Sequence, residues 1–215
     1  MKLLLLGATG RTGKWVLKMA LEKGFRVNVL VRDATKVGPQ SNLQVFEGLP
    51  AERDAVLKAA KECTAVITVL NISRTSDFPW APLRTPKTLL SSTMEVLVTI
   101  FKTVGIKKVV VCSAWGVGDS KKDIPWWFRA TIDHSNIKYA YADHQRQEEI
   151  VRSSDIDWTI VRPVGLTASK SEKQVRVTHG KRPRPRLTIG RRALAEFLIV
   201  ALTEKTLRLK TITVS

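Results

Sequence analysis

Cysteine is scarce in this chain of 215 residues, which contains only Cys63 and Cys112. Each cysteine lies beside an apolar run, so we expect two buried thiols. A disulfide framework or a cysteine-based metal site needs more cysteines than these, and the sequence therefore predicts neither. We expect no bound metal and no cysteine nucleophile.

Long apolar runs are absent as well. No stretch reaches the roughly 18 apolar residues that a membrane-spanning helix needs. The apolar run Leu3–Leu6 is interrupted by Gly7, which makes it too short for the core of a signal peptide. We therefore expect a cytoplasmic protein with no membrane association.

Acidic residues are few, with 19 Asp and Glu against 36 Lys and Arg and a formal net charge of +17. Segment 170–192 concentrates this imbalance. It holds one acid, Glu172, and nine basic residues: Lys170, Lys173, Arg176, Lys181, Arg182, Arg184, Arg186, Arg191 and Arg192. Because Pro183 and Pro185 interrupt it, we expect 180–186 to be an exposed basic loop.

Such a segment attracts polyanions, but net charge alone does not define a nucleic-acid site. Segment 170–192 contains no aromatic side chain that could stack on bases. We therefore do not expect nucleic-acid binding and keep it as the weaker alternative. A solvated surface, an anion-attracting rim and a surface for a protein partner all remain compatible with this segment.

The remaining composition, 44% hydrophobic and 26% charged, is that of an ordinary globular chain. Short apolar segments alternate along it with amphipathic ones. The expected strands are Leu3–Leu6, Val27–Val31, Leu43–Phe46, Ala65–Leu70, Val109–Cys112 and Trp158–Val161. The expected helices are Thr12–Lys23, Ala51–Glu62, Pro86–Val104 and Tyr141–Ser154, with Gly24 and Gly105 where left-handed C-caps are expected.

Nearly continuous apolar strands are typical of a parallel sheet that is buried on both faces. With crossover helices between them, the economical fold is α/β, a Rossmann-type doubly wound parallel sheet. We expect one domain over 1–215, in which 166–215 forms a small C-terminal appendage over the carboxyl edge of the sheet. This appendage would comprise the basic segment, a helix at Arg191–Leu202 and a last strand at Leu209–Val214. The sequence does not determine the oligomeric state, and a monomer is favoured.

The strongest local motif joins the first expected strand to the first expected helix and reads Gly7-Ala8-Thr9-Gly10-Arg11-Thr12-Gly13. Gly7 allows a sharp turn, Gly10 lets backbone approach a pyrophosphate, and Gly13 lets the helix pack close to the sheet. Free N–H groups at the helix start then bind phosphate. Because the required strands and helix surround it, the motif predicts a dinucleotide-binding site.

The end of the second expected strand distinguishes the two nicotinamide cofactors. An acid there would accept a hydrogen bond from the ribose 2′-hydroxyl of NAD, whereas this chain has Arg32 followed by Asp33. Arg32 can pair with a 2′-phosphate, and Arg11 could supply a second charge. Asp33 is expected to cap the turn Ala34–Val37 instead. The sequence therefore predicts NADP(H), with a solvated surface as the alternative for both arginines.

Five segments together carry a family resemblance: Gly7–Gly13, Val29–Asp33, Val111–Ala114, Ala142–Glu148 and Asp157–Pro163. In this order the chain resembles the atypical short-chain dehydrogenase/reductases with NAD(P)H-binding domains, in particular the NmrA-like and biliverdin reductase B (flavin reductase) branch. The resemblance covers residues 2 to about 165, and the basic segment that follows has no detailed match. It implies an NAD(P)H-dependent oxidoreductase.

The resemblance also implies cofactor contacts at the carboxyl ends of later strands, where open α/β sheets bind ligands. These are Ser113 and Ala114 beside the nicotinamide, Leu70 and Asn71 at its ribose, and Pro163 and Val164 at its carboxamide. After the third strand many relatives have Gly-Asp, whose acid recognises adenine. This chain has Gly48-Leu49-Pro50 there, so adenine would be held by apolar contact at Leu49 and by backbone.

Tyrosine is scarce, and this narrows the expected reaction. Ordinary members of the superfamily use a tyrosine and a lysine four residues later as acid and helper. Here Tyr139 and Tyr141 are followed at that spacing by Asp143 and Gln145. Alcohol oxidation and sugar-nucleotide epimerisation by that mechanism are therefore not expected.

The candidate catalytic residues are Ser113 and His144. The resemblance places a histidine near the substrate at His144, where it would supply a proton or hydrogen-bond the ligand, with a position on the helix surface as the alternative. Trp115 and Trp80 are the expected substrate contacts, because they lie in loops at the ligand side of the sheet. Residues 126–128, Trp-Trp-Phe, are expected to pack as lid or core residues.

The sequence therefore predicts an NADPH-dependent reductase that transfers hydride from the nicotinamide to a planar conjugated small molecule, such as a flavin, a quinone or a biliverdin-like pigment. The cofactor supplies the chemistry, and the protein orients the reactants and excludes water. The alternative is a non-catalytic NADP(H)-binding redox sensor that acts through a protein partner.

Overall fold

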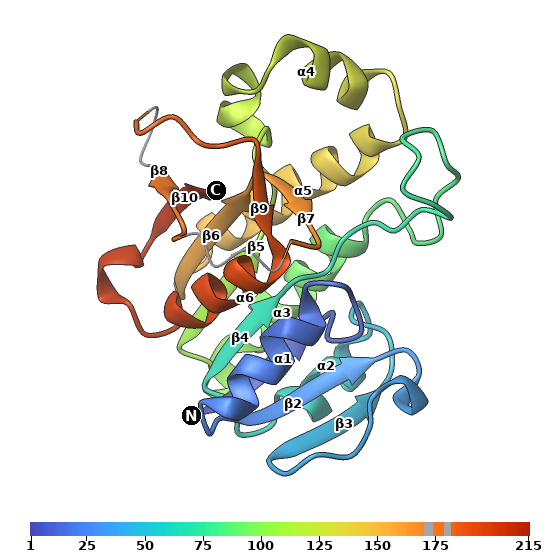
Figure 1. The fold of residues 1–215 in the computed structure, drawn as a ribbon. Helices are drawn as coiled ribbons and strands as arrows, with labels where there is room; N and C mark the ends of the chain where they lie inside the picture. The colour runs from blue at the N-terminus through green and yellow to red at the C-terminus, as the bar shows by residue number, and fades with distance from the viewer. Residues whose placement is uncertain (170–173, 179–181) are drawn as a thin grey trace.

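An eight-stranded sheet forms the centre of the computed structural model, which describes residues 1–169, 174–178 and 182–215 (Figure 1). Its strands follow the order β3-β2-β1-β4-β5-β6-β10-β8. Their bounds are β1 Lys2–Leu6, β2 Arg26–Val31, β3 Leu43–Glu47, β4 Ala65–Thr68, β5 Lys108–Cys112, β6 Asp157–Pro163, β8 Val177–Thr178 and β10 Lys210–Val214. All pairs are parallel except β8 on β10. The predicted doubly wound parallel sheet is confirmed.

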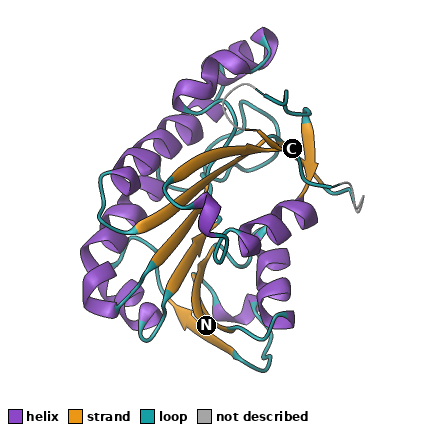
Figure 2. Cartoon of the chain, turned by 90° about the vertical axis from the view of Figure 1, so that its left-hand side faces the viewer, coloured by secondary structure: helices purple, strands orange, loops and turns teal. Residues whose placement is uncertain are grey.

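Both faces of the sheet are covered by helices, as Figure 2 shows. Helices α1 (Gly13–Glu22) and α6 (Arg191–Val200) pack together on one face. Helices α2 (Arg53–Ala60), α3 (Leu89–Val104) and α5 (Ile137–Arg152) cover the other. The four leucines of β1, Leu3–Leu6, are fully buried and alternate between the two cores, because successive strand residues point to opposite faces. The continuous apolar pattern of β1 thus reflects burial on both sides.

Several predicted element ends need correction. The fourth strand ends at Thr68, so residues 69–71 already belong to the turn above the sheet. The helix expected from Tyr141 begins four residues earlier, at Ile137. Residues 126–128 are expected to pack as lid or core residues, but they begin a helix, α4 (Trp126–Asp133), in which Trp126 and Trp127 are exposed. An eight-residue helix with one face in solvent shows too short an apolar repeat to be recognised.

The appendage contains more pairing than the sequence predicts. Strands β7 (Gly165–Thr167) and β9 (Thr188–Gly190) form a separate parallel pair. In the basic segment, Arg176 exchanges two main-chain hydrogen bonds with Ser215, at 2.8 and 3.0 Å, which fixes an edge strand beside β10. Arg182, Arg184 and Arg186 are exposed as expected.

Three of the predicted basic residues, Lys170, Lys173 and Lys181, lie outside the described residues. The same holds for Gly180 in the expected loop.

Two local expectations about turns are confirmed. Gly105 ends α3 in the left-handed region at φ 77°. Asp33 accepts a hydrogen bond from the Thr35 amide at 3.0 Å and so caps the short helical turn that follows β2. Hydrogen bonds from Thr35 and Lys36 hold the pKa of Asp33 below its usual range.

The N-terminus of α3 is capped from another helix. Asp143 on α5 is fully buried and accepts hydrogen bonds from the amides of Leu90 (2.7 Å) and Ser91 (3.3 Å) and from the Ser91 hydroxyl (2.5 Å). Its negative charge also lies at the positive end of the helix dipole. The local N-cap position, Thr88, makes no side-chain cap, so Asp143 replaces it and joins α3 to α5.

We expect Asp143→Ala to lower the free energy of unfolding by about 3 kcal/mol, because it leaves buried amide donors without an acceptor. Asp155→Ala is the matched control, since Asp155 forms an exposed ion pair with Lys102, and this substitution should cost less than about 1 kcal/mol. Urea unfolding of both variants measures the difference. Equal losses in the two variants would contradict the capping role.

Candidate functional site

The glycine turn after β1 has the geometry that its sequence predicts. Gly7 has φ 90°, and a Cβ added to Gly13 would lie 2.0 Å from the Gly7 carbonyl oxygen. The helix start is thus pressed against the turn, and no residue larger than glycine fits at position 13. The Gly10 amide donates to the Gly7 carbonyl at 3.0 Å and closes the turn. The backbone therefore forms the cradle that a pyrophosphate needs.

A cleft of about 510 Å³ runs from this turn across the sheet. Eleven of the predicted site residues line it: Gly7, Thr9, Gly10, Arg11, Thr12, Arg32, Leu49, Leu70, Asn71, Ser113 and His144. They come from the loops after β1, β2, β3, β4 and β5 and from α5. One continuous cleft thus joins the expected phosphate, adenine and nicotinamide ends of a dinucleotide site.

The two arginines of the predicted NADP site differ in their surroundings. Arg32 follows β2 on the cleft wall and makes no ion pair within the described part of the chain. Arg11 instead forms a bidentate pair with Asp77, at 2.7 and 2.8 Å. Its hydrogen bonds lower the pKa of Asp77. Arg32 is therefore available to pair with a 2′-phosphate, whereas Arg11 would first have to break its ion pair with Asp77.

The main-chain groups of Pro163 and Val164, predicted to hold the carboxamide, already have hydrogen-bond partners within the protein. The Pro163 carbonyl accepts from the Trp115 amide at 2.9 Å, and the Val164 amide donates to the Val214 carbonyl at 3.1 Å. Neither residue lines the cleft, nor does Ala114. Strand β10 extends the sheet beside β6 and takes up the Val164 amide, whereas the loop after β5 takes up the Pro163 carbonyl. Ala8 and Gly13 are buried behind the turn.

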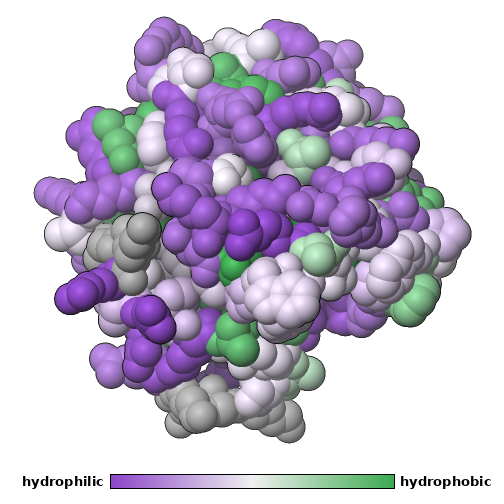
Figure 3. Space-filling model, turned by 90° about the horizontal axis from the view of Figure 1, so that it is seen from above, coloured by the Kyte–Doolittle hydropathy of each residue, from purple (hydrophilic) through white to green (hydrophobic). Residues whose placement is uncertain are grey.

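The predicted aromatic substrate contacts also lie away from the cleft. Trp115 is 7% exposed and belongs to the hydrophobic core that also includes residues of α1 and α6. Trp80 is half exposed, and its indole N–H donates to the His134 carbonyl at 2.8 Å. The expectation that Trp115 and Trp80 contact the substrate is corrected accordingly. Seen from above, the visible face of the molecule is mostly hydrophilic with small apolar patches (Figure 3).

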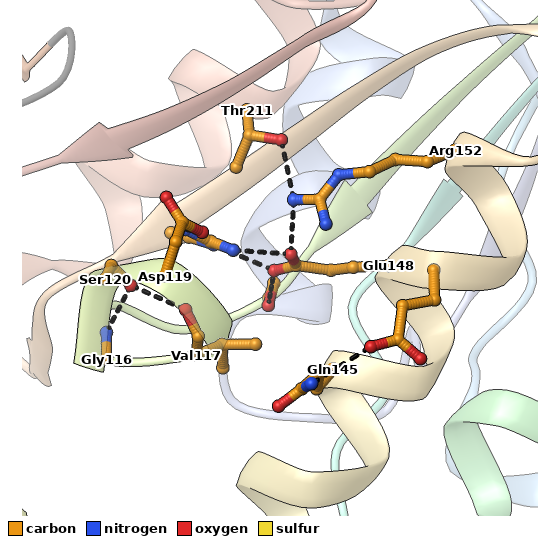
Figure 4. A network of polar contacts seen from close by, with 11 residues as sticks. Gly116, Val117, Asp119, Ser120, Gln145, Glu148, Arg152 and Thr211 are labelled. Carbon is orange, nitrogen blue, oxygen red and sulfur yellow. Dashed lines mark hydrogen bonds and ion pairs between the residues drawn. The ribbon is translucent and has the colours of Figure 1, made fainter.

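Ser113 is anchored by a buried ion-pair network that the sequence did not predict. Its hydroxyl donates to Glu148 Oε1 at 2.6 Å. The same carboxylate accepts from Arg162 Nε (2.9 Å) and Nη2 (2.7 Å) and from Arg152 Nη2 (2.7 Å). Figure 4 shows Arg152 between Glu148 and Thr211. Ser113, Glu148 and Arg162 are each less than 5% exposed, so this network is fixed within the protein.

His144 is buried rather than on the helix surface. It is 3% exposed, lines the cleft, and its Nδ1 has no hydrogen-bond partner among the described residues. Burial lowers the pKa of His144, although the carboxylates of Glu148 and Asp143 act in the opposite direction. The imidazole is therefore neutral near pH 7, and its Nδ1 is a buried polar atom without a partner among the described residues.

Neither tyrosine-spacing position provides a free acid or helper group at the cleft. Tyr141 is largely buried, its hydroxyl donates to the Trp115 carbonyl at 3.2 Å, and burial raises its pKa. Asp143 caps the N-terminus of α3. The two cysteines are free and buried as expected, and burial raises the pKa of Cys63 to about 11 and of Cys112 to about 12.

Some cleft residues were missed by sequence reasoning. Leu166 of β7 and Arg191 at the start of α6 both line the cleft, so the appendage contributes to it directly. Arg191 was assigned only to the basic segment. Burial lowers its pKa, and the charge of Arg11 adds to this effect. The sequence shows only that Arg191 stands at the start of an expected helix. The tertiary fold brings this residue to the cleft beside the glycine turn.

The comparisons with known proteins agree with this geometry. The sequence matches the NAD(P)H-binding family over residues 7–205, and the chain belongs to that family. An oxidoreductase of Pestalotiopsis microspora is 28% identical over 178 residues, which are 75% of this chain and 66% of that protein. The match thus spans a little under two thirds of that relative's length.

Solved structures share the fold over the whole chain. ChuY, an anaerobilin reductase from Escherichia coli O157:H7, superposes with a TM-score of 0.80 at 19% identity and covers 100% of this chain and 96% of its own. A short-chain dehydrogenase/reductase of Veillonella parvula in complex with NADP gives 0.77 at 16% identity, covering 100% and 94%. The chain therefore belongs to the NAD(P)H-binding family and has the Rossmann fold of these structures. No helix in the described ranges is long and apolar enough to cross a membrane.

His144 should make stability depend on pH. Its folded pKa lies below the ordinary value of about 6.5 that it regains on unfolding. As the pH falls below about 6.5, the unfolded state therefore takes up a proton that the folded state does not, and stability declines by up to about 1.4 kcal/mol per pH unit. Urea unfolding between about pH 8 and pH 5 measures this. We expect His144→Gln to flatten the decline and the exposed His134→Gln to leave it unchanged; identical slopes in all three proteins would contradict the assignment.

Proposed function

We propose that this protein is an NADPH-dependent reductase that passes a hydride to a planar conjugated acceptor, such as a flavin, a quinone or a biliverdin-like tetrapyrrole. The observation that carries this proposal is one cleft that joins the glycine turn to Ser113 and His144. The anaerobilin reductase among the structural neighbours is compatible with it. When bound, NADPH supplies the hydride.

The residues around the cleft would bind the cofactor in a fixed orientation. The glycine-turn backbone and the α1 N-terminus would bind the pyrophosphate, and Arg32 would pair with the 2′-phosphate. Leu49 would contact the adenine. These groups come from three successive loops above the sheet, so the cofactor would cross the strands with its nicotinamide toward Ser113.

The inner end of the cleft is suited to an acceptor that needs no strong acid. Tyr141 is committed to the Trp115 carbonyl, and His144 is neutral near pH 7. A conjugated acceptor spreads the added negative charge over its ring system, so it requires less help from a proton donor than an isolated carbonyl does. His144 would hydrogen-bond such an acceptor, and its small protonated fraction would donate a proton.

We expect NADPH to bind more tightly than NADH, because Arg32 can neutralise the 2′-phosphate. Arg32→Ala should weaken NADPH binding by about ten- to a hundredfold and leave NADH binding nearly unchanged. Arg26→Ala is the control, since Arg26 lies at the opposite end of the same strand. Calorimetric titration with both cofactors decides the point, and equal affinities of the wild type for NADPH and NADH would reject it.

We expect the protein to oxidise NADPH when a free flavin, a quinone or biliverdin is added. His144→Gln should lower kcat/KM for the acceptor by about tenfold or more, because a hydrogen-bonding group at the reacting end is changed, while NADPH affinity is preserved. His134→Gln should behave as wild type. Absorbance of NADPH follows the reaction. Tight NADPH binding without turnover of any acceptor would instead favour the redox-sensor alternative.

A further inference from the structure

The hydrogen-bonding polarity of Ser113 is fixed by its buried partner. Glu148 is 1% exposed and lies between the guanidinium groups of Arg162 and Arg152, with three contacts of 2.7 to 2.9 Å. Both of its oxygens accept hydrogen bonds from guanidinium N–H groups, which can only donate. The 2.6 Å contact with Ser113 Oγ therefore contains the serine proton.

This arrangement leaves Ser113 with only one kind of bond to offer a ligand. A serine hydroxyl has one proton and two lone pairs, and its proton is already donated to Glu148. Ser113 lines the cleft, so what it presents there is an acceptor oxygen. A carbonyl oxygen placed against it would find no donor, whereas an N–H group would find an acceptor with increased electron density.

We propose that Ser113 selects an N–H donor at the inner end of the cleft, and that Glu148 is the positioning residue that makes it do so. This inference rests on the proposed function, because it specifies the ligand group at the nicotinamide end of the same site. Two ligands can supply the N–H group: the carboxamide of the cofactor, and a ring N–H of the acceptor, such as a flavin imide or a pyrrole.

Two cofactor analogues separate donor from acceptor recognition. The acetylpyridine analogue of NADP⁺ keeps the carbonyl oxygen but lacks the N–H group, whereas the thionicotinamide analogue keeps the N–H group and loses the oxygen. The measured quantity is the ratio of the two dissociation constants, acetylpyridine analogue over thionicotinamide analogue. If Ser113 accepts from the carboxamide, this ratio should be about five- to tenfold larger for the wild type than for Ser113→Ala. Calorimetry measures all four affinities. Ser154→Ala, which removes a hydroxyl that donates to the Val151 carbonyl of its own helix end, should retain the wild-type ratio.

A second comparison tests whether the N–H group belongs to the acceptor. A flavin methylated at its imide nitrogen lacks the N–H group but keeps its redox chemistry. With saturating NADPH, the wild type should reduce the methylated flavin with about five- to tenfold lower kcat/KM than the parent flavin, and Ser113→Ala should lose this difference. A Ser113-dependent effect in either comparison supports the proposal and identifies the source of the N–H group.

Glu148→Gln tests the positioning role itself. The introduced amide can donate to Ser113 Oγ, which releases the serine proton toward the cleft. The preference for N–H ligands should then fall to the level of Ser113→Ala or reverse. Because the change also places an uncharged group between Arg162 and Arg152, thermal unfolding is measured first. If the variant does not fold, the Ser113→Ala comparisons alone decide the proposal.

Two results would overturn the inference. One is a Ser113-dependent loss for the thionicotinamide analogue, since Ser113 would then be donating to the carbonyl. The other is the absence of any Ser113-dependent difference with the cofactor analogues and with the methylated flavin. Failure of the proposed function would look different, because every acceptor would then remain unreduced while the cofactor affinities could still be compared.

Discussion

The rest of the site depends on the buried ion pairs that the Glu148 carboxylate forms with Arg162 and Arg152. A guanidinium as buried as that of Arg162 is stable only with charged partners, because removing it from water costs several kcal/mol. Through Glu148, Arg162 and Arg152, the end of β6, helix α5 and strand β10 meet at one point. Ser113 is attached to the same carboxylate, so the position of the cleft's inner end follows from the packing of the sheet.

The outer end of the cleft depends on a different constraint, the close contact between Gly13 and Gly7. It brings the start of α1 over the end of β1, where the N–H groups and the helix dipole favour an anion. Arg11, Arg32 and Arg191 add positive charge around this point. The net charge of +17 therefore includes residues that a phosphate-bearing cofactor would meet, and salt would weaken the attraction to those that are exposed.

Much of the fold and part of the site were predictable because their causes are local. The glycine spacing predicted the turn, and the continuous apolar runs predicted a sheet buried on both faces. Asp33 caps the turn after β2 through its sequence neighbour Thr35, so this cap too has a local cause. Trp115 was misplaced for the opposite reason: the sequence places it just after Ser113, but tertiary packing turns its side chain into the core.

By itself, the sequence determined the α/β architecture, the dinucleotide cradle and the absence of a tyrosine–lysine pair, since each follows from short-range spacing. Only the tertiary structure decided which polar groups are free. Asp143 caps a helix more than 50 residues away and Arg11 pairs with Asp77 across 66 residues. Glu148 and Arg162 settle the polarity of Ser113. These contacts join distant parts of the chain, where burial makes the choice of partner energetically decisive and no local pattern records it.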